Sequence, residues 1–337
     1  MIYLETGSFD PTWNLAFEEY CLKEVTQFPE IILLWQNSNA VILGRYQNAE
    51  KEVNAKAVQD IGAKIVRRST GGGAVYHDMG NLNYSFIFPV ERTEDIDIHT
   101  LSKPITDALN KLGIPAEIQG RNDIVLNSKK ISGAAQRYHR GRVLHHGTLL
   151  FDSNLDILEK VLCADISKIT SKGISSVRSR VANIQDYLHI KNYDINAFKK
   201  DLLNTLAMNN DFESYSLTDQ DLDKIRVLQH TKYQTWDWNM GSSPPFTYKN
   251  SKRFPGGQIE IHVHVERGTI QRCKIWGDFL GLISLDELEA SLQGVRYTKT
   301  DVLETLKNLD LRMFLGSLSA TSFVECLFQE ATLPLLE

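Results

Sequence analysis

The stretch 67–78 combines residue types that can hold an anion. Arg67 and Arg68 precede the glycines Gly71, Gly72 and Gly73, and the triplet Tyr-His-Asp follows. Glycine tolerates a positive φ and lets a ligand approach the backbone closely. Clustered backbone N–H groups bind anions, and an arginine can donate two parallel hydrogen bonds to a phosphate or carboxylate. The stretch therefore indicates an anion-binding loop. A run of glycines without the other residues would more often be a hairpin turn.

This stretch matches neither common nucleotide-binding loop. It lacks the Lys-Ser/Thr ending of a P-loop and the Gly-x-Gly-x-x-Gly pattern of a dinucleotide fold. The flanks 63–68 and 81–88 have the apolar and polar pattern of strands, so we expect the glycines in a strand-to-strand hairpin. A nucleotide bound here would not meet a helix N-terminus directly after the glycines.

A second candidate segment, 120–136, is predicted to form a strand, a tight turn and another strand. It contains the pair Lys129 and Lys130. If the second strand is extended, Lys130 shares a face with Ser132, and Lys129 lies on the other face or at the turn. A solvated basic hairpin tip is the simpler interpretation. The small residues 133–135 nevertheless leave space for a ligand against the backbone, so we expect one lysine of the pair to enter a site.

Two further segments are candidates. His145 and His146 are neighbours on a predicted strand, so they face opposite sides and cannot easily chelate one metal ion. Histidines that form hydrogen bonds on a strand are the simpler interpretation.

The segment 171–184 contains Gly173 and several serines. This composition suggests a loop that closes over a phosphate-bearing intermediate, or a helix cap followed by solvated arginines. No Gly-x-Ser-x-Gly turn or cysteine-centred loop indicates a covalent nucleophile. A lysine that stabilises developing negative charge fits better.

The remaining pattern predicts the elements that position these segments. Asp10 and Pro11 are typical of a helix start. Further helices are expected at 51–61, 101–112 and through most of 155–233, and strands at 30–35, 40–45 and within 118–151. Residues 236–245 have the composition of a linker, and 258–270 alternate like a β-hairpin. We expect a catalytic domain at 1–245 and an accessory domain at 246–337.

Composition limits the class of protein. The chain has 337 residues, 42% of them hydrophobic, and a net charge of −5. General nucleic-acid binding favours a basic domain, so we expect no nucleic-acid partner. No apolar run reaches membrane-spanning length and no signal peptide is apparent, which favours a cytoplasmic protein without membrane contact. The four cysteines lack the spacing of a zinc or redox motif.

Taken together, the four segments resemble a lipoate–protein ligase of the biotin/lipoate protein ligase family, in the single-chain form with a C-terminal accessory domain. The resemblance rests on RRSTGGGAVYHDMGN, GRNDIVLNSKKISGAAQ, HHGTLL and SKGISSVRSRVANI, in that order. It implies an α+β protein, with a mixed-sheet catalytic domain of the biotin/lipoate ligase type and a small C-terminal α+β domain. Thr70 departs from the usual serine but keeps the hydroxyl.

The resemblance also implies a reaction in two steps. Lipoate and Mg-ATP form lipoyl-AMP and pyrophosphate. The lipoyl group then passes to a lysine of an apo-lipoyl carrier domain of a 2-oxoacid dehydrogenase complex, or of the glycine-cleavage H protein. The cofactors implied are thus ATP and Mg²⁺, and the protein partners are these carriers. We predict no dedicated protein site for the metal.

Residue roles follow from the same motifs. Lys130 would be the catalytic residue, between the α-phosphate and the lipoate carboxylate. The ATP contacts implied are Arg68, Gly73, Ala74, Val75, Tyr76 and Lys130. The lipoate or lipoyl-AMP contacts implied are Lys130, Gly71, Gly72, Asn81, Asp123 and His146.

Two alternatives remain open. A transferase of the same fold would move octanoyl or lipoyl groups without ATP; such relatives use a cysteine nucleophile or lack the accessory domain. Cys163 is the cysteine to consider for that role, although a buried helix residue is the simpler interpretation. A non-catalytic protein that holds lipoate or an acyl-adenylate is the other alternative, and the presence of Lys130 argues against it.

Overall fold

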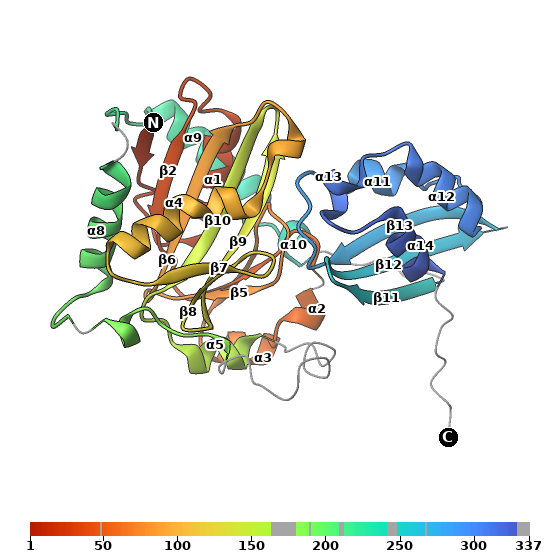
Figure 1. The fold of residues 1–337 in the computed structure, drawn as a ribbon. Coiled ribbons are helices and arrows are strands. Elements are labelled where there is room, and N and C mark those ends of the chain that lie inside the picture. Colours follow the sequence, from red (N-terminus) through yellow and green to blue (C-terminus); the bar gives the residue numbers. More distant parts are fainter. Residues whose placement is uncertain are drawn as a thin grey trace. The chain divides into compact units, whose positions relative to one another are not determined.

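The computed structural model describes residues 1–47, 49–162, 180–188, 190–208, 212–240, 248–266 and 268–328. They belong to two compact units (Figure 1). Unit 1 comprises Met1–Gly44, Ala49–Ser69 and Ala74–Gly241, and unit 2 comprises Arg45–Asn48, Thr70–Gly73 and Ser242–Glu337. Two short segments of the N-terminal half therefore belong with the C-terminal unit. The boundary predicted at 245/246 lies outside the described residues and stays a prediction.

Unit 1 contains a mixed seven-stranded sheet and a smaller three-stranded sheet. The large sheet is parallel at its β1–β2 pair and antiparallel elsewhere. In spatial order, its strands are β1 (Ile2–Leu4), β2 (Ile31–Trp35), β6 (Asn81–Pro89), β10 (Arg142–Leu150), β9 (Lys129–His139), β8 (Asp123–Leu126) and β7 (Ala116–Gln119). The small sheet has the order β4 (Lys64–Arg67), β3 (Ala40–Leu43) and β5 (Val75–His77).

The helices of unit 1 pack against both faces of the large sheet. One hydrophobic cluster joins α4 and α8 to one face, and another joins α1 to the other. The helices are α1 (Pro11–Lys23), α2 (Ala49–Glu52), α3 (Ala55–Asp60), α4 (Ile98–Lys111), α5 (Leu155–Val161), α8 (Ile195–Ala207), α9 (Asp219–Leu228) and α10 (Trp236–Asn239). Short 3₁₀ turns cover Thr93–Asp95 and Gln185–Tyr187, and a π-helical turn covers Gln229–Tyr233.

The start of α1 confirms its prediction. The Asp10 carboxylate accepts a hydrogen bond from the Thr12 backbone N–H at 2.9 Å, and Pro11 is the first helical residue. This arrangement satisfies a backbone donor that the helix itself cannot pair, and proline gives up no hydrogen bond at this position. The helix then buries most of its side chains, including the adjacent Glu18 and Glu19.

Three details differ from the sequence prediction. The glycine stretch does not close a hairpin, because β4 and β5 pair with opposite edges of β3 rather than with each other. α4 begins at Ile98, earlier than predicted, because Asp97 caps its first turn. Residues 236–239 form the short helix α10 instead of a linker, and the Thr235 side chain caps it.

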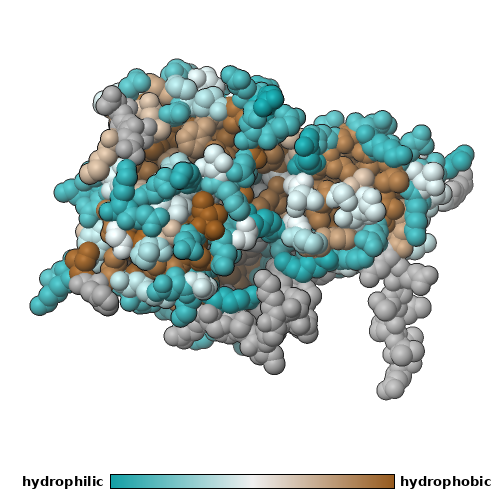
Figure 2. Space-filling model, in the orientation of Figure 1, coloured by the Kyte–Doolittle hydropathy of each residue, from teal (hydrophilic) through white to brown (hydrophobic). Residues whose placement is uncertain are grey.

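Unit 2 is a small α+β unit, as the sequence predicts. Its antiparallel sheet has the order β11 (Tyr248–Phe254), β12 (Gly257–Glu266) and β13 (Thr269–Gly277). The helices are α11 (Asp286–Ser291), α12 (Lys299–Lys307), α13 (Leu311–Leu315) and α14 (Ala320–Leu327). The β12–β13 hairpin confirms the alternating pattern, whereas β11 lacks apolar alternation and was not predicted. In Figure 2, hydrophilic residues cover much of the visible face, with hydrophobic residues between them.

Two buried histidines of unit 1 make its stability depend on pH. Burial, reinforced by His146, lowers the pKa of His145 to about 3. Burial, reinforced by Arg68 and His146, lowers the pKa of His77 to about 3. An unfolded histidine has a pKa of about 6.5, so the unfolded chain binds these protons first. The stabilisation is complete above that pH and is lost progressively as the pH falls toward the folded-state pKa.

We therefore predict that the free energy of unfolding falls as pH drops below about 6.5, by roughly 1.4 kcal/mol per pH unit for each histidine. Urea unfolding of the protein and of His145→Gln at several pH values checks this. The variant should show the shallower dependence on pH. Equal slopes between pH 6 and pH 5 would contradict the assignment of His145 as a buried neutral group.

Candidate functional site

Four predicted site residues lie on one face of the large sheet. Cross-strand partners share a face of a sheet, and so do alternate residues of a strand. Asp123 pairs with Gly133 across β8–β9, and His146 pairs with Ser85 across β10–β6. Asn81 alternates with Ser85 through Asn83 along β6, which places it on the face of His146. The face shared by Lys130, Asp123, Asn81 and His146 is called the site face below.

A β-bulge brings Lys130 to this face. The β8–β9 register pairs Val125 with Lys130 but Ile124 with Ser132, so Ile131 is an extra residue on β9. A bulge of this kind shifts the alternation of side chains along its strand. Lys130 Nζ lies 2.7 Å from Asp123 Oδ1, which places Lys130 with Asp123 and Gly133.

The bulge corrects one prediction and is consistent with another. Ser132 is fully buried and pairs with Ile124, whereas Lys130 pairs with the next residue of β8, Val125, so the two side chains lie on opposite faces. The prediction that Lys130 and Ser132 share a face is therefore wrong, because regular alternation does not hold across the bulge. Lys129 is exposed, in line with the expectation that only one lysine of the pair turns toward a site.

Gly133 leaves the space in which the Lys130 ammonium lies. A Cβ atom at Gly133 would lie 2.8 Å from Lys130 Nζ. The Gly133 backbone N–H donates to Thr148 Oγ1 at 3.3 Å, which fixes β9 beside β10 at this point. Gly133, the first of the small residues that follow Ser132, thus lies directly beside the lysine.

A buried carboxylate of α1 organises the other end of the site face. Glu18 is 1% exposed, and its Oε1 accepts hydrogen bonds from Ser85 Oγ at 2.6 Å and from His146 Nδ1 at 2.7 Å. Ser85 Oγ also accepts the Trp35 indole N–H at 2.9 Å. The His146 ring therefore donates its Nδ1–H to the Glu18 carboxylate, and this hydrogen bond fixes the orientation of the ring.

Arg68 is electrostatically coupled to the same carboxylate. It is 6% exposed, and one guanidinium nitrogen donates to the Ile42 carbonyl at 3.2 Å. Burial lowers the pKa of Arg68 to about 10, while the negative charge of Glu18 opposes this shift and the positive charge of Arg67 reinforces it. Arg68 therefore stays protonated at neutral pH, as an anion-binding role requires.

The other residues of the glycine stretch have diverse surroundings. Tyr76 is 1% exposed and its hydroxyl donates to Asn39 Oδ1 at 3.2 Å, whereas Ala74 and Val75 are half-buried. Arg67 donates to backbone carbonyls of unit 1. Its guanidinium therefore serves the fold rather than an anion.

Gly71, Gly72 and Gly73 belong to unit 2. The Gly72 N–H donates to the Phe279 carbonyl at 3.1 Å, and the ring of Tyr46 stacks on that of Phe279 with centroids 5.0 Å apart. A Cβ atom at Gly71 would lie 2.4 Å from the Phe279 carbonyl oxygen, so no side chain fits there. Glycine is thus required at Gly71 by close backbone packing.

Sequence reasoning missed Glu18, Ser85 and Trp35. The available signal was a pair of adjacent glutamates in a helix whose other residues are largely apolar. Such a pair is unusual, because glutamate is almost never fully buried unless it is paired. The partners of Glu18 come from β6 and β10, and no local pattern connects those strands to α1.

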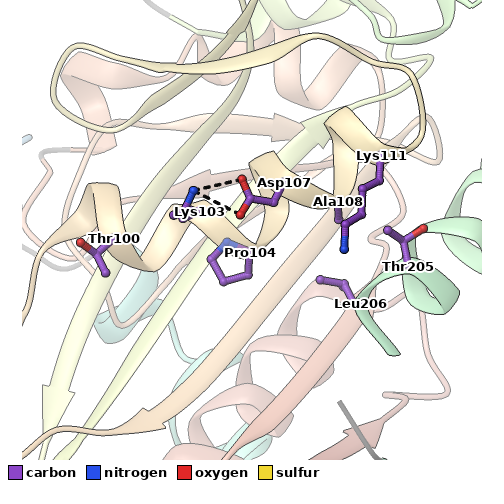
Figure 3. A pocket seen from close by; sticks show the side chains of 8 residues that line it. All are labelled: Thr100, Lys103, Pro104, Asp107, Ala108, Lys111, Thr205 and Leu206. Atoms are coloured by element: carbon purple, nitrogen blue, oxygen red, sulfur yellow. Dashed lines mark hydrogen bonds and ion pairs between the residues drawn. The ribbon is translucent and has the colours of Figure 1, made fainter. Parts of the chain in front are cut away.

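Other features of the described residues do not add to the site. A groove of about 320 Å³ between α4 and α8 contains none of the predicted site residues, and its Lys103 forms an ion pair with Asp107 (Figure 3).

Among the described residues, no three His, Cys, Asp or Glu side chains cluster as metal ligands. None of the helices within the described ranges is long and apolar enough to span a bilayer. Gly173 to Ser179 and Cys163 lie outside the described residues.

Comparisons with known proteins identify the family of this chain. Residues 10–207 match the lipoyl protein ligase A/B catalytic domain, and residues 243–327 match the bacterial lipoate protein ligase C-terminus. The chain belongs to the lipoyl protein ligase A/B family. It is 40% identical to the lipoate-protein ligase LplJ of Bacillus subtilis over 97% of this chain and 100% of that protein. It is also 40% identical to lipoate–protein ligase 1 of Staphylococcus aureus, over 92% and 94% of the two chains.

Solved structures of lipoyl protein ligases resemble the fold. LipL1 of P. falciparum in complex with lipoate matches with a TM-score of 0.77 at 27% identity, over 92% of this chain and 94% of that one. A lipoate-protein ligase A bound with ATP matches with a TM-score of 0.59 at 30% identity, over 71% and 97%. A bi-partite ligase of Thermoplasma acidophilum, studied with its E2 lipoyl domain, matches with a TM-score of 0.61 at 30% identity, over 73% and 98%. These matches confirm the predicted α+β fold class.

The position of Gly133 generates a test of the site. We predict that Gly133→Ala displaces the Lys130 ammonium and slows formation of the acyl-adenylate by about tenfold or more, as expected when one charge-stabilising contact is lost. The melting temperature should change little, because the far end of a flexible side chain can move aside. Pyrophosphate release measures the rate. A wild-type rate in a well-folded Gly133→Ala protein would show that the Lys130 position is not needed.

Proposed function

We propose that this protein attaches lipoate to carrier proteins through an ATP-derived lipoyl-adenylate. The observation that carries the proposal is the Lys130–Asp123 pair, held at 2.7 Å on the face that also presents His146 and Asn81, within a chain of this ligase family. Lipoate and ATP are the ligands named for related structures. Mg²⁺ enters with the nucleotide phosphates, as is usual for this ion.

The first step requires two anions to meet. A carboxylate oxygen of lipoate attacks the α-phosphorus of ATP, the bond to the β-phosphate oxygen breaks, and pyrophosphate leaves. Lys130 lowers the repulsion between the carboxylate and the α-phosphate and stabilises the charge that develops in the transition state. Asp123 holds the ammonium in place until the substrates arrive, because a carboxylate at 2.7 Å restricts a flexible lysine side chain. Arg68 and the residues of the 73–76 segment contact ATP.

The second step transfers the acyl group. The neutral amine of a carrier lysine attacks the lipoyl carbonyl, an amide bond forms, AMP leaves with the bonding electron pair, and the nitrogen loses a proton. We propose lipoyl domains of 2-oxoacid dehydrogenase complexes and the H protein as carriers. A bi-partite relative studied with its E2 lipoyl domain supports the first of these. On the basis of the family motifs we assign the binding of lipoate or lipoyl-AMP to Lys130, Gly71, Gly72, Asn81, Asp123 and His146. A cytoplasmic location stays a prediction.

The three cysteines within the described residues are poorly suited to be the nucleophile of an ATP-independent acyl transfer. Cys21, Cys273 and Cys326 are free and buried. Burial raises the pKa of all three thiols, and that of Cys326 to about 12. A thiol with a raised pKa is a poor nucleophile, because the thiolate is the reactive form.

A direct assay tests the function. The protein, lipoate, Mg-ATP and an apo-carrier domain are incubated, and the carrier is weighed by mass spectrometry. We expect the mass of one lipoyl group on the carrier only when ATP is present. Transfer from an octanoyl-carrier without ATP, with no adenylate formed, would contradict the proposal and favour the transferase.

Two lysine variants test the residue assignment. Lys130→Ala should nearly abolish adenylate formation while the fold is retained, because removal of one stabilising contact can cost on the order of 3–4 kcal/mol of transition-state stabilisation. Lys129→Ala is the matched control, since Lys129 is exposed and is expected to have little effect. Pyrophosphate release and circular dichroism are the measurements. Greater damage from the Lys129 change would mean that the wrong lysine has been assigned.

A further inference from the structure

Arg67 is a buried arginine whose hydrogen bonds join distant parts of unit 1. It is 5% exposed. Its guanidinium donates to the carbonyl oxygens of Gly44 at 2.8 Å, Trp238 at 3.1 Å and Asn239 at 3.0 Å. Its backbone takes part as well. The Arg67 N–H donates to Asn239 Oδ1 at 2.9 Å, and the Arg67 carbonyl accepts the Trp238 indole N–H at 2.8 Å.

These partners have a common place in the chain. The chain leaves unit 1 for unit 2 after Gly44, after Ser69 and after Gly241. Gly44 is the last residue before the first departure. Arg67 itself lies two residues before the second, and Trp238 and Asn239 lie shortly before the third. Arg67 thus binds together the last part of unit 1 at all three places where the chain departs.

Arg68 lies directly after the residue that makes these hydrogen bonds. The Arg68 N–H donates to the Leu43 carbonyl at 2.9 Å, and its guanidinium to that of Ile42 at 3.2 Å, so it is held along β3. The Arg67 guanidinium binds the Gly44 carbonyl, which follows β3, and the carbonyls of Trp238 and Asn239 in α10. The end of β4 is therefore fixed from two sides immediately before Arg68 and the glycine segment.

We propose that Arg67 is a positioning residue for ATP: it fixes Arg68 and the entry to the glycine segment 70–73 by tying Gly44 and α10 to the end of β4. This proposal rests on the proposed function. The chemistry requires arginine, because one planar group reaches three carbonyl oxygens on two separate segments, Gly44 and α10. The compact ammonium of lysine does not present the same rigid set of donors. In this proposal Arg67 acts through Arg68 and the glycine segment and has no contact of its own with either substrate.

Arg67→Lys tests the proposal, and the chain offers a matched control. Arg142 is also buried, and its guanidinium donates to the carbonyls of Cys21, Leu22, Val25 and Phe28 at 3.0 to 3.2 Å. Arg142→Lys therefore removes a similar set of bonds at the end of α1. The measurements are the KM values for ATP and for lipoate in adenylate formation, the rate of transfer from preformed lipoyl-AMP to an apo-carrier, and the melting temperature.

We expect Arg67→Lys to raise the KM for ATP by about tenfold, the equivalent of one lost charge-assisted hydrogen bond. The KM for lipoate and transfer from preformed lipoyl-AMP should change less than about twofold. Arg142→Lys should lower the melting temperature without raising the KM for ATP. Trp238→Phe, which removes the indole donor to the Arg67 carbonyl, should raise the KM for ATP by a smaller factor.

Other outcomes overturn the proposal. If Arg67→Lys and Arg142→Lys both lose stability while the KM for ATP stays at the wild-type value in each, Arg67 has only a structural role. Equal rises in the KM for ATP and for lipoate also contradict it. If Arg67→Lys fails to fold, an unchanged KM for ATP in Trp238→Phe serves as the contradicting result. Failure of the proposed function can be distinguished from failure of the positioning role. In the former case the wild-type protein itself would form no lipoyl-AMP from ATP.

Discussion

The site depends on one buried carboxylate, that of Glu18. A charge this deeply buried is stable only when it is paired and hydrogen-bonded. Glu18 meets the requirement with Ser85 and His146 on the large sheet and with the nearby charge of Arg68, which directly follows β4 of the small sheet. The need to satisfy one charge thereby brings three elements of the candidate site to one helix. The same charge opposes the lowering of the Arg68 pKa by burial.

The next residue of α1 shows that burial of a glutamate can also serve the fold alone. Glu19 is fully buried and pairs with Lys23, Arg137 and Lys232 at 2.6 to 3.2 Å. Burial opposes its charge, but the cations outweigh burial and hold the pKa of Glu19 well below its ordinary value. This cluster joins α1 to β9 and to the π-helical turn. The two adjacent glutamates of α1 thus differ in role. Glu18 contacts residues of the candidate site, whereas Glu19 stabilises the packing of α1.

Much of the fold could be predicted because its signals are local. The Asp10-Pro11 cap, the apolar strands and the alternation of β12 and β13 each depend on a few neighbouring residues. The site residues Lys130, Asp123, Asn81 and His146 were found through motifs, and the structure brings them to one face. Their roles remain predictions.

The parts that sequence reasoning missed depend on contacts between distant segments. The bulge at Ile131 exists only in the register of β9 against β8, so strict alternation placed Ser132 wrongly. The hairpin expected around the glycines fails because β3, more than twenty residues earlier in the chain, lies between β4 and β5. Glu18 was not selected because its partners are 67 and 128 residues away.

The most direct test of this account compares Glu18→Gln with Glu19→Gln. Each change keeps the shape of the side chain and removes its charge. The measurement is the rate of lipoyl-AMP formation from lipoate and ATP per folded molecule, beside the melting temperature. The account predicts that Glu18→Gln slows adenylate formation by about tenfold or more, as for loss of about 1.4 kcal/mol or more, whereas Glu19→Gln mainly lowers the melting temperature. Wild-type adenylate formation by a folded Glu18→Gln protein would contradict the central role of this carboxylate.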